Sequence, residues 1–236
     1  MIILYILLGI VGVILLVYTV SALLVSPKKE YMKESPYYRF LLNAATGFIL
    51  KLLRIHVHTE GMEKLPADRS VVFLSNHRSN YDPIISWYVF RNHHIAFVSK
   101  AGNFKIPWFG RIIRKCCFMA IDRKSPRAAI KTVNQAAELL KDGYNSVGIY
   151  PEGTRNRGEG LLPFHDSILR IPQKAGVPIV VLTMIGTEKI ARHRPFRRTD
   201  VYIKVLDVIS AEEVTSTRSN ILGAKIREEM EIDLNQ

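Results

Sequence analysis

The segment VVFLSNHRSNYDPIISWYVF, residues 71–90, decides which fold the chain is expected to have. It opens with the apolar run Val71–Leu74, which is rich in β-branched residues and predicts a buried strand. A polar stretch then leads to Asp82 and Pro83, which are typical of the start of a helix, here predicted to run to Phe90. A strand joined to a helix by a short polar loop is the building unit of a sheet flanked by helices.

The polar loop holds a histidine and an aspartate five positions apart, His77 and Asp82. An imidazole near its ordinary pKa can take a proton, and a carboxylate at Nδ1 would fix the ring and stabilise the imidazolium. Asp82 is also expected to cap the helix, since Asp at the N-cap followed by Pro is a common helix start. Both roles are compatible because a carboxylate has two oxygens. By itself the pair is a weak indication of a catalytic base.

The rest of the chain beyond Gly61 repeats this alternation of apolar runs and helical patterns. We predict strands at residues 70–75, 95–99, 116–121, 146–150, 178–185 and 201–206, and helices at 83–90, 126–141, 166–175 and 218–236. Ser125 and Pro126 mark the start of the clearest helix, and Gly143 follows its end. The predicted fold class is α/β, with a mostly parallel sheet flanked by helices.

Composition limits the class of partner. The chain has 236 residues, 48% of them hydrophobic and 23% charged, which suits one sizeable folded core. The formal net charge of +12 favours an anionic partner such as nucleic acid, anionic lipid or a phosphorylated small molecule.

The N-terminal segment favours lipid among these partners. Residues Ile2 to Ser26 carry no charge and are long enough to cross a bilayer as a helix. A cleaved signal peptide is the alternative, but no Lys or Arg precedes this long apolar run. Lys28 and Lys29 follow it, so we predict a single-pass cell-membrane protein with the remainder on the cytoplasmic face. Anionic phospholipids are then the expected partner, and nucleic acid is not.

A second apolar segment, Tyr37 to Val57, has a helical pattern with basic residues at Arg39, Lys51 and Arg54. Such a helix is expected either to lie in the membrane interface or to pack on the core of the domain. The predicted organisation is therefore residues 1–35 as membrane helix and basic flank, 36–60 as interfacial or core-packing helix, and 61–236 as the catalytic domain.

The only cysteines, Cys116 and Cys117, are adjacent in a run that predicts a buried strand. Neighbouring cysteines do not staple a fold, and no Cys/His spacing in the sequence suits a metal. We expect both thiols to serve as core packing.

Two further polar clusters follow predicted strands, where sheets of this class bind their ligands. One is Ile121-Asp122-Arg123-Lys124, whose Arg123 could grip a phosphate. The other, Tyr150 to Arg157, contains a Gly that permits close backbone approach together with Thr and Arg donors. Taken singly, each cluster is also typical of an ordinary polar surface loop.

Together the boxes H-x4-D, I-D-R and P-E-G-T-R, in this order behind an apolar helix, resemble the glycerolipid acyltransferase family typified by 1-acyl-sn-glycerol-3-phosphate acyltransferase. The resemblance covers about Leu65 to Thr187. Between the first two boxes, Lys100, Lys105, Pro107 and Gly110 match the family's K-x4-K-x-P-x-x-G stretch.

The resemblance implies a role for each matched position. His77 would be the general base and Asp82 its orienting partner. The positions implied in substrate binding are Arg123, Glu152, Gly153, Thr154, Arg155, Lys100 and Lys105. Members of the family transfer an acyl group from acyl-CoA or acyl-carrier protein to a glycerophosphate hydroxyl, with no metal or bound cofactor.

The sequence thus predicts a membrane-bound enzyme that converts 1-acyl-sn-glycerol-3-phosphate (lysophosphatidic acid) to phosphatidic acid in phospholipid biosynthesis. Glycerol-3-phosphate or another lysophospholipid remain alternative acceptors, because the chain departs from the family pattern at Gly102, Asn103 and Val181 and over Phe164 to Ser167. A phosphatase or esterase using the same pair is less favoured, since no G-x-S-x-G elbow occurs. A non-catalytic phospholipid-binding protein would not require a His-Asp pair.

Overall fold

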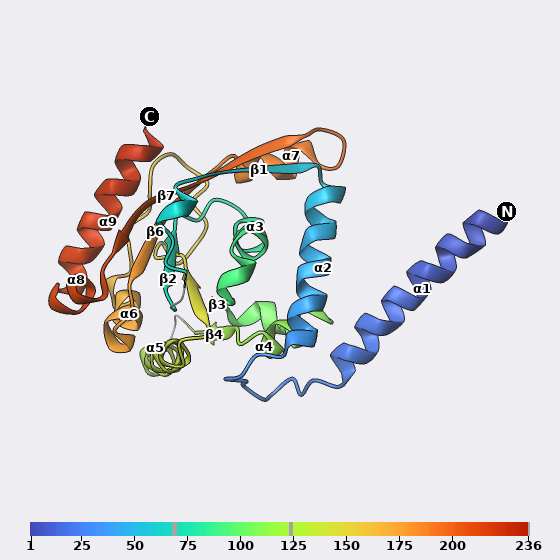
Figure 1. Ribbon diagram of the computed structural model, residues 1–236, viewed down its shortest axis with the longest axis horizontal. Helices are drawn as coiled ribbons and strands as arrows, with labels where there is room; N and C mark the ends of the chain where they lie inside the picture. The colour runs from blue at the N-terminus through green and yellow to red at the C-terminus, as the bar shows by residue number, and fades with distance from the viewer. Residues whose placement is uncertain (68–69, 123–124, 236) are drawn as a thin grey trace.

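The fold is an α/β domain from which one long helix extends (Figure 1). The computed structural model describes residues 1–67, 70–122 and 125–235. Helix α1 (Ile2–Leu23) leads through an irregular segment to α2 (Pro36–Leu52) and then into a seven-stranded sheet. The predicted fold class is confirmed.

The strands of the sheet lie in the order β1-β7-β6-β2-β5-β3-β4. Their bounds are β1 (Ile55–Glu60), β2 (Val72–Ser75), β3 (Ile95–Lys100), β4 (Met119–Ile121), β5 (Ser146–Ile149), β6 (Ile179–Ile185) and β7 (Thr199–Ile209). Neighbours from β6 to β4 pair in parallel, while β7 is antiparallel to β6 and parallel to β1. The sheet is therefore mostly parallel, as predicted. The sequence did not predict β1, because after Ile55 its side chains are half-buried or exposed and no apolar run marks it.

Helices cover both faces of the sheet. The remaining helices are α3 (Asp82–Val89), α4 (Phe109–Lys115), α5 (Pro126–Lys141), α6 (Arg170–Ala175), α7 (Ile190–His193), α8 (Ala211–Ser216) and α9 (Ser219–Leu234). On β2, Phe73 packs into the core shared with α2, α3 and α4, whereas Val72 and Leu74 pack into the core shared with α5, α6, α8 and α9. Strands buried on both faces need continuous apolar sequence, which explains the runs that predicted them.

Helix α5 confirms the capping signals in its sequence. The Ser125 hydroxyl accepts a hydrogen bond from the Ala128 backbone N–H at 3.3 Å, and Gly143 beyond the helix end has a φ of 73°.

The cysteine pair lies outside a strand, so that prediction was wrong. Cys116 and Cys117 form the turn after α4, with Cys117 at a φ of 59°, and β4 begins at Met119. An apolar run does not distinguish a buried turn from a buried strand. Burial raises the pKa of the Cys117 thiol to about 12, so it stays protonated, in keeping with a packing role.

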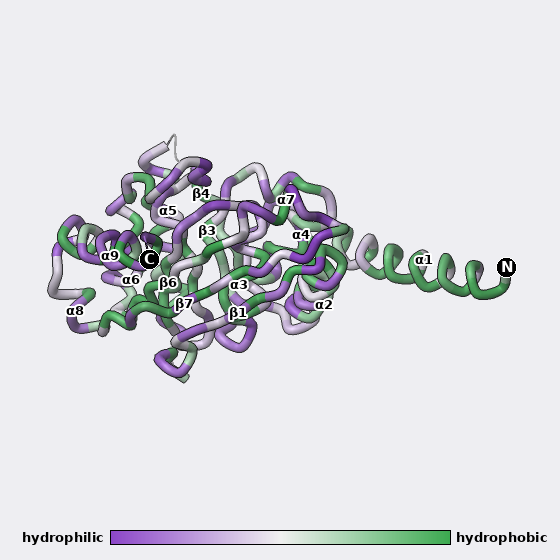
Figure 2. Tube along the Cα trace, turned by 90° about the horizontal axis from the view of Figure 1, so that it is seen from above, coloured by the Kyte–Doolittle hydropathy of each residue, from purple (hydrophilic) through white to green (hydrophobic). Residues whose placement is uncertain are grey.

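The C-terminal end of α1 is bonded into the domain. The Tyr38 hydroxyl donates to the Ser21 carbonyl at 2.8 Å, and the Arg111 guanidinium donates to the Val25 carbonyl at 3.2 Å. The rest of α1 is exposed, and by length and composition it is able to cross a membrane. Figure 2 shows this apolar helix leaving the end of the domain where α2, α4 and α7 lie.

Helix α2 has two apolar faces. One face buries Leu41, Leu42 and Leu50 in the core. The other leaves four large side chains exposed, Tyr37, Phe40, Phe48 and Leu52. The helix ends at Leu52 and not at Val57, because Arg54 takes a φ of 53° and β1 begins directly after it.

A buried ionic cluster fixes the segment between α1 and α2. The Glu34 carboxylate accepts a hydrogen bond from Arg39 Nε at 2.5 Å, and it pairs with His94 Nδ1 at 2.6 Å just before β3. The Arg39 guanidinium also lies over the Trp87 ring, 4.3 Å from its centroid. The chain leaving the apolar helix is thereby tied to the sheet.

We predict that Arg39→Met lowers the free energy of unfolding by about 3–5 kcal/mol, because it leaves the Glu34 carboxylate buried without its guanidinium. The double variant Arg39→Met, Glu34→Gln removes both charges and is expected to recover part of that loss. Denaturant unfolding of detergent-solubilised protein measures both. A double variant less stable than Arg39→Met alone would contradict this assignment.

Candidate functional site

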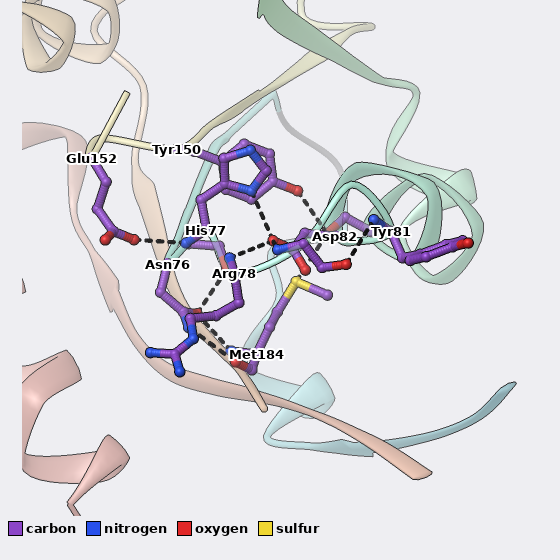
Figure 3. A network of polar contacts seen from close by, with 11 residues as sticks. Asn76, His77, Arg78, Tyr81, Asp82, Tyr150, Glu152 and Met184 are labelled. Atoms are coloured by element: carbon purple, nitrogen blue, oxygen red, sulfur yellow. Dashed lines mark hydrogen bonds and ion pairs between the residues drawn. The ribbon is translucent and has the colours of Figure 1, made fainter. Parts of the chain in front are cut away.

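His77, in the loop between β2 and α3, meets Asp82, the first residue of α3 (Figure 3). His77 Nδ1 lies 2.7 Å from Asp82 Oδ2; the Asp82 side chain is 0% exposed and that of His77 is 18% exposed. A carboxylate only accepts hydrogen bonds, so Nδ1 is the donor and a neutral ring carries its lone pair on Nε2. No residue within the described part of the chain bonds to Nε2. The geometry is that of a general base in a fixed tautomer.

The Asp82 carboxylate is held by the loop itself. Its Oδ2 also accepts hydrogen bonds from the backbone N–H groups of Arg78 and Ser79, both at 2.7 Å. The prediction that Asp82 caps the helix was wrong: Tyr81 occupies the N-cap, and α3 begins at Asp82. Its carboxylate turns back towards the preceding loop, because N–H groups there converge on it together with the imidazole.

The loop after β5 holds both backbone groups of His77. The His77 N–H donates to Glu152 Oε1 at 2.7 Å, and the His77 carbonyl accepts from the Asn156 N–H at 2.7 Å. Strands β2 and β5 are parallel neighbours, so their carboxyl ends meet. Residues 153–155 lie between these two anchors and are therefore fixed beside the histidine. Among them Thr154 and Arg155 are exposed, and Gly153 takes a φ of 68° that favours glycine.

Glu152 is a supporting group in this geometry. Its second oxygen, Oε2, accepts from the Leu162 backbone N–H at 2.9 Å, and the residue is buried. Burial raises the pKa of its carboxyl, although the two backbone N–H groups and His77 oppose that shift. The carboxylate thus joins His77 to the loop at Leu162. Direct contact between Glu152 and a substrate stays a prediction.

Tyr150 belongs to the polar cluster that the sequence indicated, but no role in the site was predicted for it. Its ring stacks on the His77 imidazole at 4.3 Å between centroids and 21° between planes. Its hydroxyl pairs with Ser86 Oγ at 3.4 Å. Burial, with the nearby Asp82 charge, raises the pKa of the phenol well above its ordinary value, so the ring stays neutral. The signal in the sequence that could have identified Tyr150 is its position directly before the P-E-G-T-R box.

Asn76 was also missed. Its amide donates to the Met184 carbonyl at 2.9 Å, and its Oδ1 accepts from the Met184 N–H at 2.7 Å. The side chain thereby fixes the end of β2 against β6, one residue before His77. A buried amide at a strand end was not recognisable from the sequence, because its partner lies far along the chain.

The predicted basic residues follow neighbouring strands. Lys100 ends β3 and Lys105 lies in the short 3-10 helix that follows, and both are exposed. Strands β3 and β4 run parallel to β5, which places Lys100 at the same edge of the sheet as His77. Arg123 lies outside the described residues. The roles of all three in substrate binding stay predictions.

Comparison with known proteins identifies relatives of this arrangement. The model of the family described as Acyltransferase matches residues 56–185, more than half of the chain. The Haemophilus influenzae 1-acyl-sn-glycerol-3-phosphate acyltransferase is 28% identical over 172 residues, covering 71% of each chain. The chloroplastic Brassica napus acyltransferase BAT2 of the same name is 36% identical over 132 residues, which are 56% of this chain and 38% of that protein. This chain therefore spans little more than a third of the plant relative.

A solved structure shares the fold. The crystal structure of the 1-acyl-sn-glycerophosphate (LPA) acyltransferase PlsC from Thermotoga maritima superposes with a TM-score of 0.68 at 25% sequence identity, covering 84% of this chain and 78% of that one. The family resemblance inferred from the sequence boxes is confirmed.

We predict that Asp82→Asn lowers kcat about 10²–10⁴-fold, because a neutral amide no longer stabilises the imidazolium that forms when His77 takes a proton. The Asn oxygen can still accept from the Arg78 and Ser79 N–H groups, so the unfolding midpoint should change little. Turnover and thermal unfolding are measured on the same preparation. A collapse of stability as large as the loss of turnover would contradict an orienting role.

A second prediction concerns the stack on His77. Tyr150→Phe keeps the ring and is expected to stay within about two-fold of the wild-type kcat. Tyr150→Leu removes an aromatic contact of about 1 kcal/mol and should lower kcat roughly five- to ten-fold. Equal turnover in the Phe and Leu variants would show that the ring does not position the imidazole.

Proposed function

Because the chain belongs to the acyltransferase family, we propose that it transfers a fatty acyl group to the free hydroxyl of 1-acyl-sn-glycerol-3-phosphate, giving phosphatidic acid for phospholipid biosynthesis. The observation that carries the proposal is the His77–Asp82 pair with the Glu152-to-Asn156 loop bonded to both backbone groups of His77. The names of the bacterial and plant relatives support this choice of acceptor.

The proposed reaction begins with the acceptor hydroxyl beside His77 Nε2. The imidazole takes the hydroxyl proton as the oxygen attacks the thioester carbonyl of acyl-CoA or acyl-carrier protein, and the new C–O bond gives a tetrahedral intermediate. The C–S bond then breaks, and the imidazolium returns the proton to the leaving thiolate. Asp82 stabilises the imidazolium between these two steps. The proposed reaction uses neither a metal nor a bound cofactor.

The acceptor phosphate is proposed to bind the exposed donors of the adjacent loop. Thr154 and Arg155 lie between the two hydrogen bonds that fix the loop to His77, so a phosphate held there would lie close to the base. Guanidinium groups bind phosphate oxygens bidentately, and the left-handed Gly153 leaves the loop backbone without a side chain in the way. Arg123, Lys100 and Lys105 are proposed to add positive charge along the same edge.

The proposed enzyme works at a membrane. Helix α1 is long and apolar enough to span a bilayer, and its bonded C-terminal end supports its retention as part of the folded protein. The exposed apolar face of α2 suits the membrane interface, while its other face packs on the core. The lysines after α1 favour a single-pass protein with its catalytic domain in the cytoplasm, beside the bilayer that holds the acceptor.

Acyl transfer is tested with purified protein, labelled acyl-CoA or acyl-carrier protein, and a panel of lysophosphatidic acid, glycerol-3-phosphate and lysophosphatidylcholine. We expect phosphatidic acid to be the main product. His77→Ala should lower turnover by about two to four orders of magnitude, because it removes the general base.

His165→Ala is the matched control. His165 lies in the loop after β5, but it is not paired with a carboxylate among the described residues. The variant should keep most of the turnover. Release of free fatty acid without an esterified product would indicate a hydrolase and overturn the proposal, as would wild-type turnover in His77→Ala.

A further inference from the structure

The loop Arg192–Arg198 is a surface that the proposed chemistry does not use. It carries arginines at 192, 194, 197 and 198 and no acidic residue. At its tip Phe196 is 82% exposed. A single exposed aromatic side chain is ordinary by itself, but here it lies on a segment with four arginines and no acidic residue.

Hydrogen bonds give this loop a defined shape. The Arg197 N–H donates to the His193 carbonyl at 2.8 Å, and the Arg54 guanidinium donates to the Phe196 carbonyl at 2.9 Å. His193 Nδ1 also lies 3.0 Å from the Thr199 hydroxyl. The backbone beneath Phe196 is therefore held, and its ring projects from a structured base.

The arginines of the loop fall into two classes. Arg194 donates to the Tyr81 hydroxyl at 2.6 Å, and Arg198 pairs with Asp200 at 2.6 Å. Arg192 and Arg197 are exposed, and neither guanidinium group has a hydrogen bond or ion pair with any residue that the structure describes. Two cations thus remain free beside the exposed ring.

The loop continues the exposed apolar face of α2. Phe48 and Leu52 lie on that face one helical turn apart, and Arg54 follows directly and bonds to the Phe196 carbonyl. Figure 1 shows α7 and the segment after it beside the C-terminal end of α2, and Figure 2 places both at the end of the domain from which α1 extends.

We propose that the Arg192–Arg198 loop docks on an anionic phospholipid surface, with the Phe196 ring at the boundary of headgroups and acyl chains and with Arg192 and Arg197 on lipid phosphates. This inference rests on the proposed function in one respect, the membrane anchorage of α1. Aromatic and basic side chains together suit that boundary. Nucleic acid would match the arginines but offers no acyl layer for the ring, and a second copy of the loop would repel it by like charge.

The docked loop lies next to the loop that holds His77. Arg194 bonds to Tyr81, the residue before Asp82, so contact with lipid at Phe196 places the start of α3 at the bilayer surface. The acceptor is itself a lipid. Docking would therefore bring the His77–Asp82 pair to the depth at which the acceptor headgroup lies.

The test places an environment-sensitive fluorophore at the tip of the loop. Phe196→Cys is labelled in the full chain and reconstituted into vesicles of phosphatidylcholine, alone or mixed with phosphatidylglycerol. Cys116 and Cys117 are 0% and 1% exposed, so they should not react. The matched control is Ile221→Cys, 56% exposed on α9 at the opposite end of the domain.

We expect the label at position 196 to shift to the blue in vesicles, more strongly with phosphatidylglycerol, while the label at 221 keeps the emission seen in water. Arg192→Gln and Arg197→Gln in the labelled chain should each weaken insertion about five-fold, equivalent to about 1 kcal/mol per arginine. Arg218→Gln, an exposed arginine at the start of α9, should have no effect.

An emission at position 196 that stays that of water in both kinds of vesicle overturns the inference. A shift that grows with protein concentration in detergent, without vesicles, also overturns it and indicates self-association. Unlabelled wild-type protein is assayed in parallel for acyl transfer to detergent-dispersed lysophosphatidic acid. Transfer without a blue shift refutes the loop alone, whereas a blue shift without transfer refutes the proposed function alone.

Discussion

The hydrogen bond from the His77 N–H to the Glu152 carboxylate is the contact on which the site depends. It joins the end of β2 to the end of β5, and the Asn156 N–H closes the same junction at the His77 carbonyl. The parallel pairing of β2 and β5 brings these groups together, so a shift in register would separate them. The sheet thus brings His77 and the loop after β5 together, and the buried Glu152 side chain fixes one to the other.

The sequence predicted the features that depend on residues close together in the chain. The apolar runs identified β2, β5 and β6, because strands buried on both faces need them, and Ser125 marked the start of α5. The His77–Asp82 contact was predictable because the two residues share one loop. The stack of Tyr150 on His77 and the bonds made by Glu152 were not predictable, since they require the pairing of strands 75 residues apart. The edge strand β1 was missed for a related reason, since its partner β7 defines it.

Two buried carboxylates hold parts of the structure together. Glu34 holds the N-terminal helices to the domain, and Glu152 holds His77 to the loop after β5. Glu34, in the segment that follows α1, bonds to Arg39 and to His94 just before β3, and Glu152 accepts hydrogen bonds from the His77 and Leu162 backbone N–H groups. Each anion is matched by donors at short distance, which offsets the cost of its burial. Burial nevertheless raises the pKa of the Glu152 carboxyl, so its donors offset only part of that cost. The remaining cost of burial is consistent with a carboxylate that positions His77 rather than one that stabilises the fold.

A continuous set of contacts runs from the outer surface to the loop that holds His77. The Arg54 guanidinium at the end of α2 holds the Phe196 carbonyl, Arg194 in the same loop holds the Tyr81 hydroxyl, and Tyr81 precedes the carboxylate that orients His77. In the proposed function the acceptor stays in the bilayer, so His77 must meet it at a fixed depth. In the proposed docked state, the residues that set this depth are linked by these contacts to His77, so membrane contact and catalysis belong to one surface.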